Sequence, residues 1–246
     1  MRRGVLLLLT ALLVLLPSFA FPQSVTLDLG SAGDGSAATR IVQLTALIAL
    51  LSLAPSLLVM VTAFARIVIV LSLLRAALGT QGTPPNTVLI GLALFLTFFV
   101  MQPAFEQAWT LGILPMTEGR VSEIEGMRLA AEPFRGFMVA NLRAEDLALF
   151  LDIADLPPPE SPALTPWRAL VPAFLVGELR RAFEIGFLLF VPFLVIDLVV
   201  ASVLMSMGMM MLPPTVVSLP FKLIFFVLVD GWRLVSGSLA QSFVGS

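Results

Sequence analysis

Two acidic residues, Asp197 and Asp230, stand inside otherwise hydrophobic segments and are candidates for chemistry. Two carboxyls that share a proton form the machinery of an aspartyl protease, and a buried carboxyl in a membrane protein often marks an ion pathway. Their contexts, Val-Ile-Asp-Leu and Val-Asp-Gly-Trp, do not match the motifs of intramembrane proteolysis. Lys222 and Arg66 also lie in apolar surroundings, so we favour ion pairs between helices or subunits, with proton or ion translocation as the alternative.

Most other catalytic chemistry is excluded by residue types that the chain lacks. It contains no Cys and no His, which removes thiol nucleophiles, disulfides, zinc sites with sulfur or nitrogen ligands, and histidine acid–base catalysis. No glycine-rich loop ends in Gly-Lys-Ser or Gly-Lys-Thr, so nucleotide hydrolysis is not expected. The net charge of −2 gives no general attraction to nucleic acid. We therefore expect no enzyme activity, no cofactor and no metal site.

The stretch from Met205 to Pro214 contains five methionines and no charged residue, although a hairpin loop at this place should be polar. One interpretation is a turn that packs against neighbouring helices. The other depends on methionine itself, whose unbranched, flexible and polarizable side chain adapts to changing apolar shapes. A ring of such loops from several subunits would form a deformable seal around a passing chain and would block ions.

Long hydrophobic segments carry these residues. Of the 246 residues, 59% are hydrophobic and only 12% are charged, which is too little charge to cover a water-soluble domain. Four apolar segments follow one another, at residues 41–74, 88–105, 183–205 and 216–235. At about 1.5 Å per residue, each can cross a hydrocarbon core of about 30 Å. They predict an all-α membrane protein with two long helical hairpins.

The N-terminus has the composition of a signal peptide. A basic start is followed by an apolar run over residues 5–16, which ends at Pro17. Ser18 and Ala20 are small residues at positions −3 and −1 of a cleavage site, so we expect cleavage after Ala20. The alternative is an uncleaved first anchor, but the run is too short to span the bilayer comfortably. Residues 21–40, rich in Gly, Ser and Ala, are expected to form a flexible periplasmic tail.

Residues 106–182 have the polar composition that the rest of the chain lacks. Ser122-x-x-Glu125 has the spacing of a capping box and predicts the start of a helix, and another helix is expected to begin near Trp167. With the mature N-terminus outside the cytoplasm, this region also lies outside and the methionine-rich loop lies on the cytoplasmic side. The predicted parts are a cleaved signal peptide (1–20), a tail (21–40), a first hydrophobic helical hairpin (41–105), a small helical extracytoplasmic (periplasmic) insert (106–182), and a second hydrophobic helical hairpin with the methionine-rich loop (183–246).

Several motifs, taken together and in order, resemble those of the FliP family of flagellar export proteins. They cover nearly everything after Leu44, and the main motifs show no departure from the family pattern. The resemblance is carried by Phe64-Ala65-Arg66-Ile67, Gly82-Thr83-Pro84-Pro85-Asn86, Phe134-Arg135-Gly136-Phe137-Met138, Ala182-Phe183-Glu184-Ile185-Gly186-Phe187, Gly208-Met209-Met210-Met211-Leu212-Pro213-Pro214, Leu219-Pro220-Phe221-Lys222 and Val229-Asp230-Gly231-Trp232.

The resemblance implies a subunit of the type III export gate in the bacterial inner membrane, within the flagellar basal body, related to a component of the injectisome gate. Family members assemble as a homo-oligomer, a pentamer, with FliQ and FliR into a closed helical channel for unfolded flagellar export substrates. FlhA and FlhB are expected nearby. Carried onto this sequence, the family's gasket around the pore would be formed by Met209, Met210 and Met211.

Two further groups of residues are carried over from the resemblance. Phe137, Phe150 and Glu178 match family positions implicated in self-assembly. The residues chosen for ion pairs between helices or subunits are Arg143, Asp197 and Lys222. The function implied is that of a core pore-forming subunit that conducts unfolded flagellar proteins across the inner membrane. The alternative, from another class, is an ion-coupled small-molecule membrane transporter that uses Asp197 or Asp230.

Overall fold

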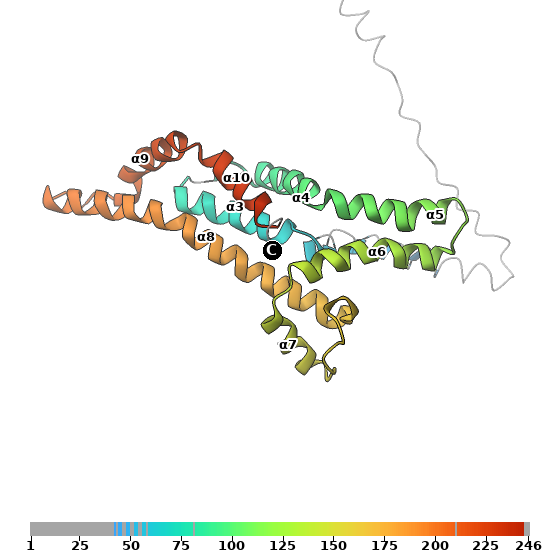
Figure 1. The fold of residues 1–246 in the computed structure, drawn as a ribbon. Coiled ribbons are helices and arrows are strands. Elements are labelled where there is room, and N and C mark those ends of the chain that lie inside the picture. Colours follow the sequence, from blue (N-terminus) through green and yellow to red (C-terminus); the bar gives the residue numbers. More distant parts are fainter. Residues whose placement is uncertain are drawn as a thin grey trace, which may run out of the picture. The chain divides into compact units, whose positions relative to one another are not determined.

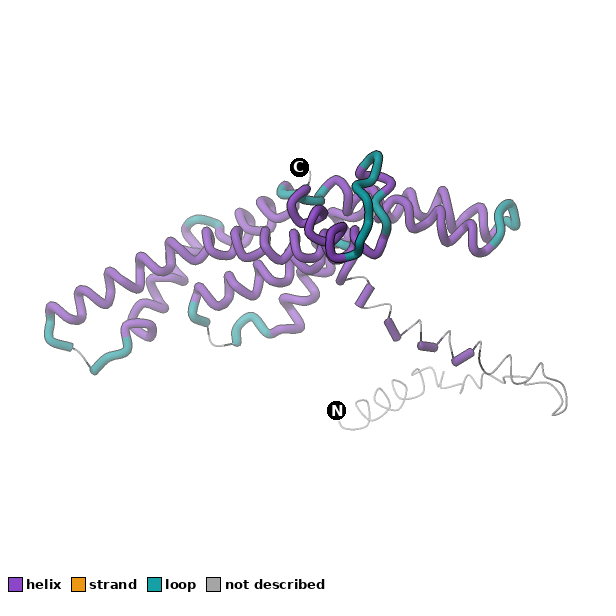
Figure 2. The backbone as a smooth tube through the Cα atoms, turned by 90° about the horizontal axis from the view of Figure 1, so that it is seen from below, coloured by secondary structure: helices purple, strands orange, loops and turns teal. Residues whose placement is uncertain are grey.

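The computed structural model describes residues 59–80, 82–209 and 211–243, together with 42, 44–45, 48–49, 52–53 and 56–57. The chain divides into two compact units, Met1–Ser52 and Leu53–Ser246, and the fold below is that of the second. The predicted signal peptide, its cleavage after Ala20 and the tail lie outside the described residues. All regular structure in the described part of the second unit is helical, which confirms the prediction of an all-α protein (Figures 1 and 2).

One helix of 40 residues, α8, organises the second unit (orange in Figure 1). Helix α3 lies along it, α7 packs on it, and α9 turns back along its C-terminal part; α4 with η1 and α5 forms a hairpin with α6. The described elements are α3 (Phe64–Leu78), α4 (Asn86–Ala108), the π-helical turn η1 (Trp109–Ile113), α5 (Leu114–Thr117), α6 (Glu123–Ala140), α7 (Ala144–Ile153), the 3-10 turn η2 (Pro162–Leu164), α8 (Trp167–Ser206), α9 (Pro214–Leu228) and α10 (Gly231–Gln241).

Within the described residues, Asn86–Thr117 and Trp167–Ser206 are each long and apolar enough to cross a membrane, and the bent pair α9–α10 passes the same test if it is taken as one span. At 40 residues, α8 is about 60 Å long, roughly twice the hydrocarbon thickness of about 30 Å. Helix α8 contains both the helix predicted to begin near Trp167 and the third apolar segment. It therefore continues without a break from residue 182, the predicted end of the insert, to residue 183, the predicted start of the second hairpin. The polar insert and the second hairpin therefore share one continuous helix.

The fourth apolar segment, predicted as one helix over residues 216–235, is divided in the structure. Helix α9 ends at Leu228 and α10 starts at Gly231, with a bend of 63° between them. Asp230 at the break has a φ of +52°, the left-handed conformation that interrupts a helix. A Cβ at Gly231 would clash with the ring of Phe226, so glycine is needed for this close approach. Hydropathy alone does not locate this break, because apolar residues continue past it at Trp232, Leu234 and Val235.

Helix α6 starts where the Ser122-x-x-Glu125 spacing predicted a helix start, with Ser122 as its N-cap. The Ser122 hydroxyl accepts a hydrogen bond from the Glu125 backbone N–H at 3.3 Å, and the helix begins at Glu123. The Arg128 guanidinium donates to both carboxylate oxygens of Glu125, at 2.9 and 2.6 Å, and these hydrogen bonds hold the pKa of that carboxyl below its ordinary value. This end of the insert is therefore built from local, exposed interactions.

Gly112 lets η1 approach α6 closely, and we expect Gly112→Ala to destabilise the protein by about 1–3 kcal/mol through overpacking. Its added Cβ would clash with the backbone nitrogen of Ala130 and lie 2.5 Å from the carbonyl oxygen of Gly126. Gly91→Ala, in α4, is the matched control, since a Cβ there meets nothing within 4 Å and alanine favours the helix by up to about 1 kcal/mol. Thermal unfolding of the detergent-solubilised variants checks this, and equal midpoints for the two would contradict it.

Candidate functional site

The methionine-rich stretch forms the turn between α8 and α9. Helix α8 ends in a Schellman motif, in which the Gly208 N–H donates to the Met205 carbonyl at 3.1 Å and the Met209 N–H donates to the Leu204 carbonyl at 2.9 Å. Gly208 has a φ of +74°, which costs glycine little. Helix α9 begins at Pro214, where the missing N–H of proline is not needed. Backbone chemistry therefore sets both ends of the loop.

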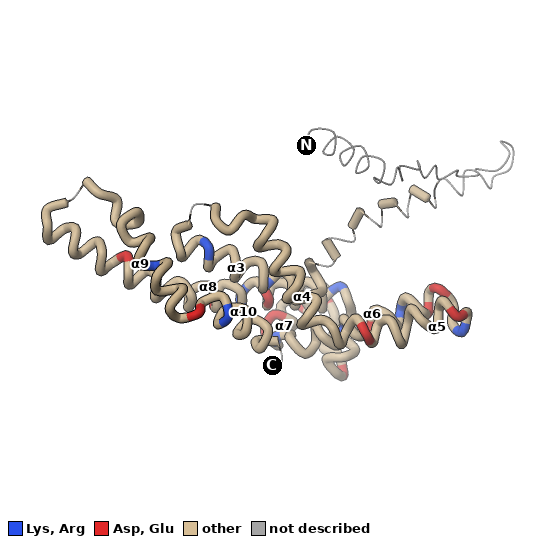
Figure 3. Tube along the Cα trace, turned by 90° about the horizontal axis from the view of Figure 1, so that it is seen from above, with Lys and Arg blue, Asp and Glu red and all other residues tan. Residues whose placement is uncertain are grey.

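The rest of the chain leaves Met209 and Met211 of the loop exposed. Met211 is 97% exposed and Met209 is 41% exposed, whereas Met210 lies outside the described residues. The sequence has no charged residue between Asp197 and Lys222, so the whole end of the α8–α9 hairpin is uncharged, as Figure 3 shows. An apolar, flexible and exposed loop of this kind can form a surface for a partner of variable shape.

Asp197 and Lys222, both predicted to form ion pairs, lie together at the base of this hairpin. The Lys222 Nζ is 2.6 Å from the Asp197 Oδ2 and also donates to the Ala77 carbonyl at 3.1 Å. The Ser218 hydroxyl donates to the other oxygen of Asp197. Lys222 is only 4% exposed, and its charge lies near the C-terminal end of α3, where a cation is favoured. We call Asp197, Ser218 and Lys222 the hairpin clip, because they fasten α9 to α8 and to α3.

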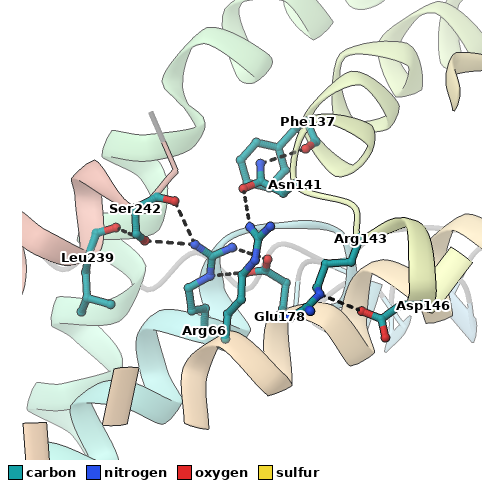
Figure 4. A network of polar contacts seen from close by, with 9 residues as sticks. Arg66, Phe137, Asn141, Arg143, Asp146, Glu178, Leu239 and Ser242 are labelled. Carbon is teal, nitrogen blue, oxygen red and sulfur yellow. Dashed lines mark hydrogen bonds and ion pairs between the residues drawn. The ribbon is translucent and has the colours of Figure 1, made fainter. Parts of the chain in front are cut away.

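A second buried ion pair joins Arg66 of α3 to Glu178 of α8 (Figure 4). The Arg66 Nε donates to Oε2 of Glu178 at 2.8 Å, and its Nη2 donates to Oε1. The remaining nitrogen, Nη1, donates to the backbone carbonyl and the hydroxyl of Ser242, at 3.2 and 3.0 Å. Arg66 is 1% exposed and Glu178 is fully buried. Charges so deeply buried are stable only when they are paired and hydrogen-bonded in this way.

The other predicted site residues lie on the insert. Phe137 of α6 is half-buried, with its ring centroid 5.9 Å from that of Phe174. Phe150 is half-buried on α7. Arg143 is the N-cap residue of α7 and does not belong to the hairpin clip. Its guanidinium lies 3.5 to 3.9 Å from the carboxylates of Glu145, Asp146 and Glu184.

The two acids considered first for chemistry have separate partners. Asp197 belongs to the hairpin clip. The Asp230 side chain is 64% exposed and lies 3.8 Å from Arg233. Among the described residues, no group of three or more possible ligands could hold a metal ion. Separate ion pairs, one between α8 and α9 and one local to the start of α10, fit structural roles better than a shared-proton pair of carboxyls.

Sequence reasoning missed the two serines that complete the buried networks, Ser218 and Ser242. A hydroxyl in an apolar helix carries no signal of its own, because serine can also bond to its own helix backbone. Arg66 did carry a signal, since a guanidinium in an apolar segment requires a carboxylate partner, but nothing in the spacing selects Glu178 as that partner.

The sequence is similar to one family along most of its length. The model of the FliP family matches residues 47–239. The flagellar biosynthetic protein FliP of Caulobacter vibrioides is 57% identical over 231 residues, which cover 93% of this chain and 86% of that protein. The proteins of the same name from Agrobacterium fabrum and Bacillus subtilis are 50% and 51% identical, over 95% and 88% of this chain and 96% and 98% of theirs.

Proposed function

The chain belongs to the FliP family of flagellar export proteins, and from this premise we propose that it is a core pore-forming subunit of the flagellar type III protein export gate. In this role it conducts unfolded flagellar proteins across the inner membrane. A small-molecule transporter driven through Asp197 or Asp230 finds no support, since the relatives are flagellar export proteins and Asp197 is held by Lys222 and Ser218. The observation that carries the proposal is the uncharged, exposed methionine-rich loop on a hairpin clamped at its base.

The surface of α8 supports assembly with other subunits. Phe187 and Leu188 are 68% and 69% exposed, and Leu198 further along is 61% exposed. Apolar faces of this extent must be covered by lipid or by protein. We propose that a homo-oligomer, a pentamer, together with FliQ and FliR, covers part of them, with FlhA and FlhB as neighbours and the insert on the periplasmic side.

The geometry of the methionine-rich loop suits a gasket. Closed rotational symmetry would place one loop from each subunit around the axis, so five copies would line a narrow constriction with methionine side chains. These side chains can re-pack around an extended polypeptide of any sequence, and they close on one another when the channel is empty. The hairpin clip would hold each loop at the same position along the channel axis, because it fixes α9 against α8 and α3.

Replacing Met209, Met210 and Met211 together with Ala is expected to leave the assembled complex intact and to make it leak small ions, since the shortened side chains no longer fill the constriction. Ion conductance of the purified complex in a planar bilayer measures the leak, and native mass spectrometry checks assembly. Met127→Ala, an exposed methionine on α6, is the control and should not leak. An assembled triple variant with unchanged conductance would show that the loop is not the seal.

A further inference from the structure

The last turn of α10 makes polar contacts that reach well beyond its own helix. The Ser242 carbonyl is one of the carbonyls left without an intrahelical partner at a helix end, and the Arg66 Nη1 donates to it. The Ser242 hydroxyl accepts a second hydrogen bond from Arg66 and donates its own proton to the Leu239 carbonyl at 2.8 Å. A guanidinium beside a helix C-terminus also interacts favourably with the helix dipole. Arg66 therefore fastens the end of α10 to α3 (Figure 4).

Phe243, the next residue, covers the same guanidinium from one side. The Arg66 guanidinium carbon is 3.7 Å from the centroid of the Phe243 ring, in the geometry of a cation–π contact. The Phe243 ring also stacks on that of Phe137 of α6, at a centroid distance of 5.9 Å. Phe243 and Phe137 both line a cavity of ≈ 500 Å³ between α4 and α6. The turn thus lies on Arg66 and on Phe137 at once.

The rest of α10 is packed on one side only. It has only 11 residues, which is too short for an isolated helix to be stable in water. Val235 and Leu239 are buried, whereas Trp232 and Leu234 on the other side are 40% and 57% exposed. At its start, the left-handed residue Asp230 separates it from α9. Its position therefore depends on packing at both ends, through Gly231 and Trp232 against Phe226 at its start and through the contacts of its last turn.

The Arg66–Glu178 ion pair can form whether or not this turn is in place. Arg66 and Glu178 make a two-point contact between α3 and α8 through nitrogens that Ser242 does not use. We infer that Leu239, Ser242 and Phe243 form a C-terminal latch that opens and closes on Arg66 while the other helices stay folded. Opening breaks the Ser242 hydrogen bonds and withdraws the Phe243 ring, and it uncovers the ion pair, Phe137 and the adjoining cavity. Such local opening requires less free energy than global unfolding.

The chain has no cysteine, so single introduced cysteines can report opening in the full-length, detergent-purified protein. Leu239→Cys, at a position 1% exposed in the latch, is compared with Val70→Cys, at a fully buried position in α3. The rate of labelling by a small maleimide is measured for each. Leu239→Cys should react about tenfold faster or more, because it needs only the latch to open. Adding Phe243→Ala should raise its rate at least about tenfold further and leave the Val70→Cys rate within about twofold.

Two companion variants keep this test decisive. Phe243→Leu keeps apolar volume but removes the ring from Arg66, so a smaller selective rise is expected even where Phe243→Ala folds poorly. Leu234→Ala truncates an exposed residue of the same helix and should leave both rates unchanged. Rates that rise equally at both cysteines would show that the turn is an inseparable part of the core. An unchanged Leu239→Cys rate in both Phe243 variants would show that Phe243 does not close a latch. Either result overturns the proposal.

Discussion

Glu178→Ala is expected to lower the free energy of unfolding by about 3–5 kcal/mol, enough to prevent accumulation of folded protein, because it leaves a buried guanidinium without its carboxylate. Arg66 is 1% exposed, and Ser242 offers it only neutral acceptors. Arg66→Ala should cost a similar amount, since the fully buried carboxylate then loses the cation that donates hydrogen bonds to both of its oxygens. The yield of monodisperse protein in detergent and its thermal unfolding midpoint measure the effect.

A double variant distinguishes the loss of a charge pair from the loss of packing. Arg66→Met with Glu178→Leu removes both charges and keeps apolar volume, so it should recover most of the stability, as paired buried charges can often be replaced by well-packed apolar residues. A double variant as unstable as either single variant would contradict this account. Because Glu178 pairs within its own chain, a loss of oligomer in Glu178→Ala is expected to follow from a loss of fold, and the double variant tests this directly.

Lys222→Ala is expected to have the second largest effect, about 1–3 kcal/mol, and to release α9 from α8 at the base of the methionine-rich loop. It leaves Asp197 without its cation, although the Asp197 side chain is 21% exposed and so keeps some hydration. It also removes the hydrogen bond that ties α9 to the end of α3. Thermal unfolding measures the stability, and ion conductance of the assembled gate reports whether the loops still meet.

Arg233→Ala is the matched control, since its pair with Asp230 is a contact of 3.8 Å between side chains that are 86% and 64% exposed. Exposed pairs of this kind contribute little, so a loss of less than about 1 kcal/mol is expected and the conductance should not change. Equal losses of stability for Lys222→Ala and Arg233→Ala would contradict a structural role for the hairpin clip.

Local features of the chain were predictable from the sequence. The apolar segments predicted helices because a run of hydrophobic residues in a membrane must bond its own backbone. Ser122 and Glu125 predicted the start of α6 because capping depends on residues three positions apart. The two ends of the methionine-rich loop also follow from local chemistry, since Gly208 ends one helix and Pro214 begins the next. Each of these features is decided by neighbours in the chain.

Tertiary structure alone decided which charges meet and where the long helices continue or break. Arg66 and Glu178 are 112 residues apart, and Arg66 and Ser242 are 176 apart, so no periodicity connects them. The composition of the chain required partners for its buried charges, because an isolated ion is too costly in an apolar interior, but many pairings satisfy that requirement. Likewise α8 and α9 carry apolar residues on their exposed sides as well as on their buried sides, so hydropathy cannot show which face packs inward or that Gly231 must lie on Phe226. Packing between distant segments selects one arrangement among those that the local chemistry allows.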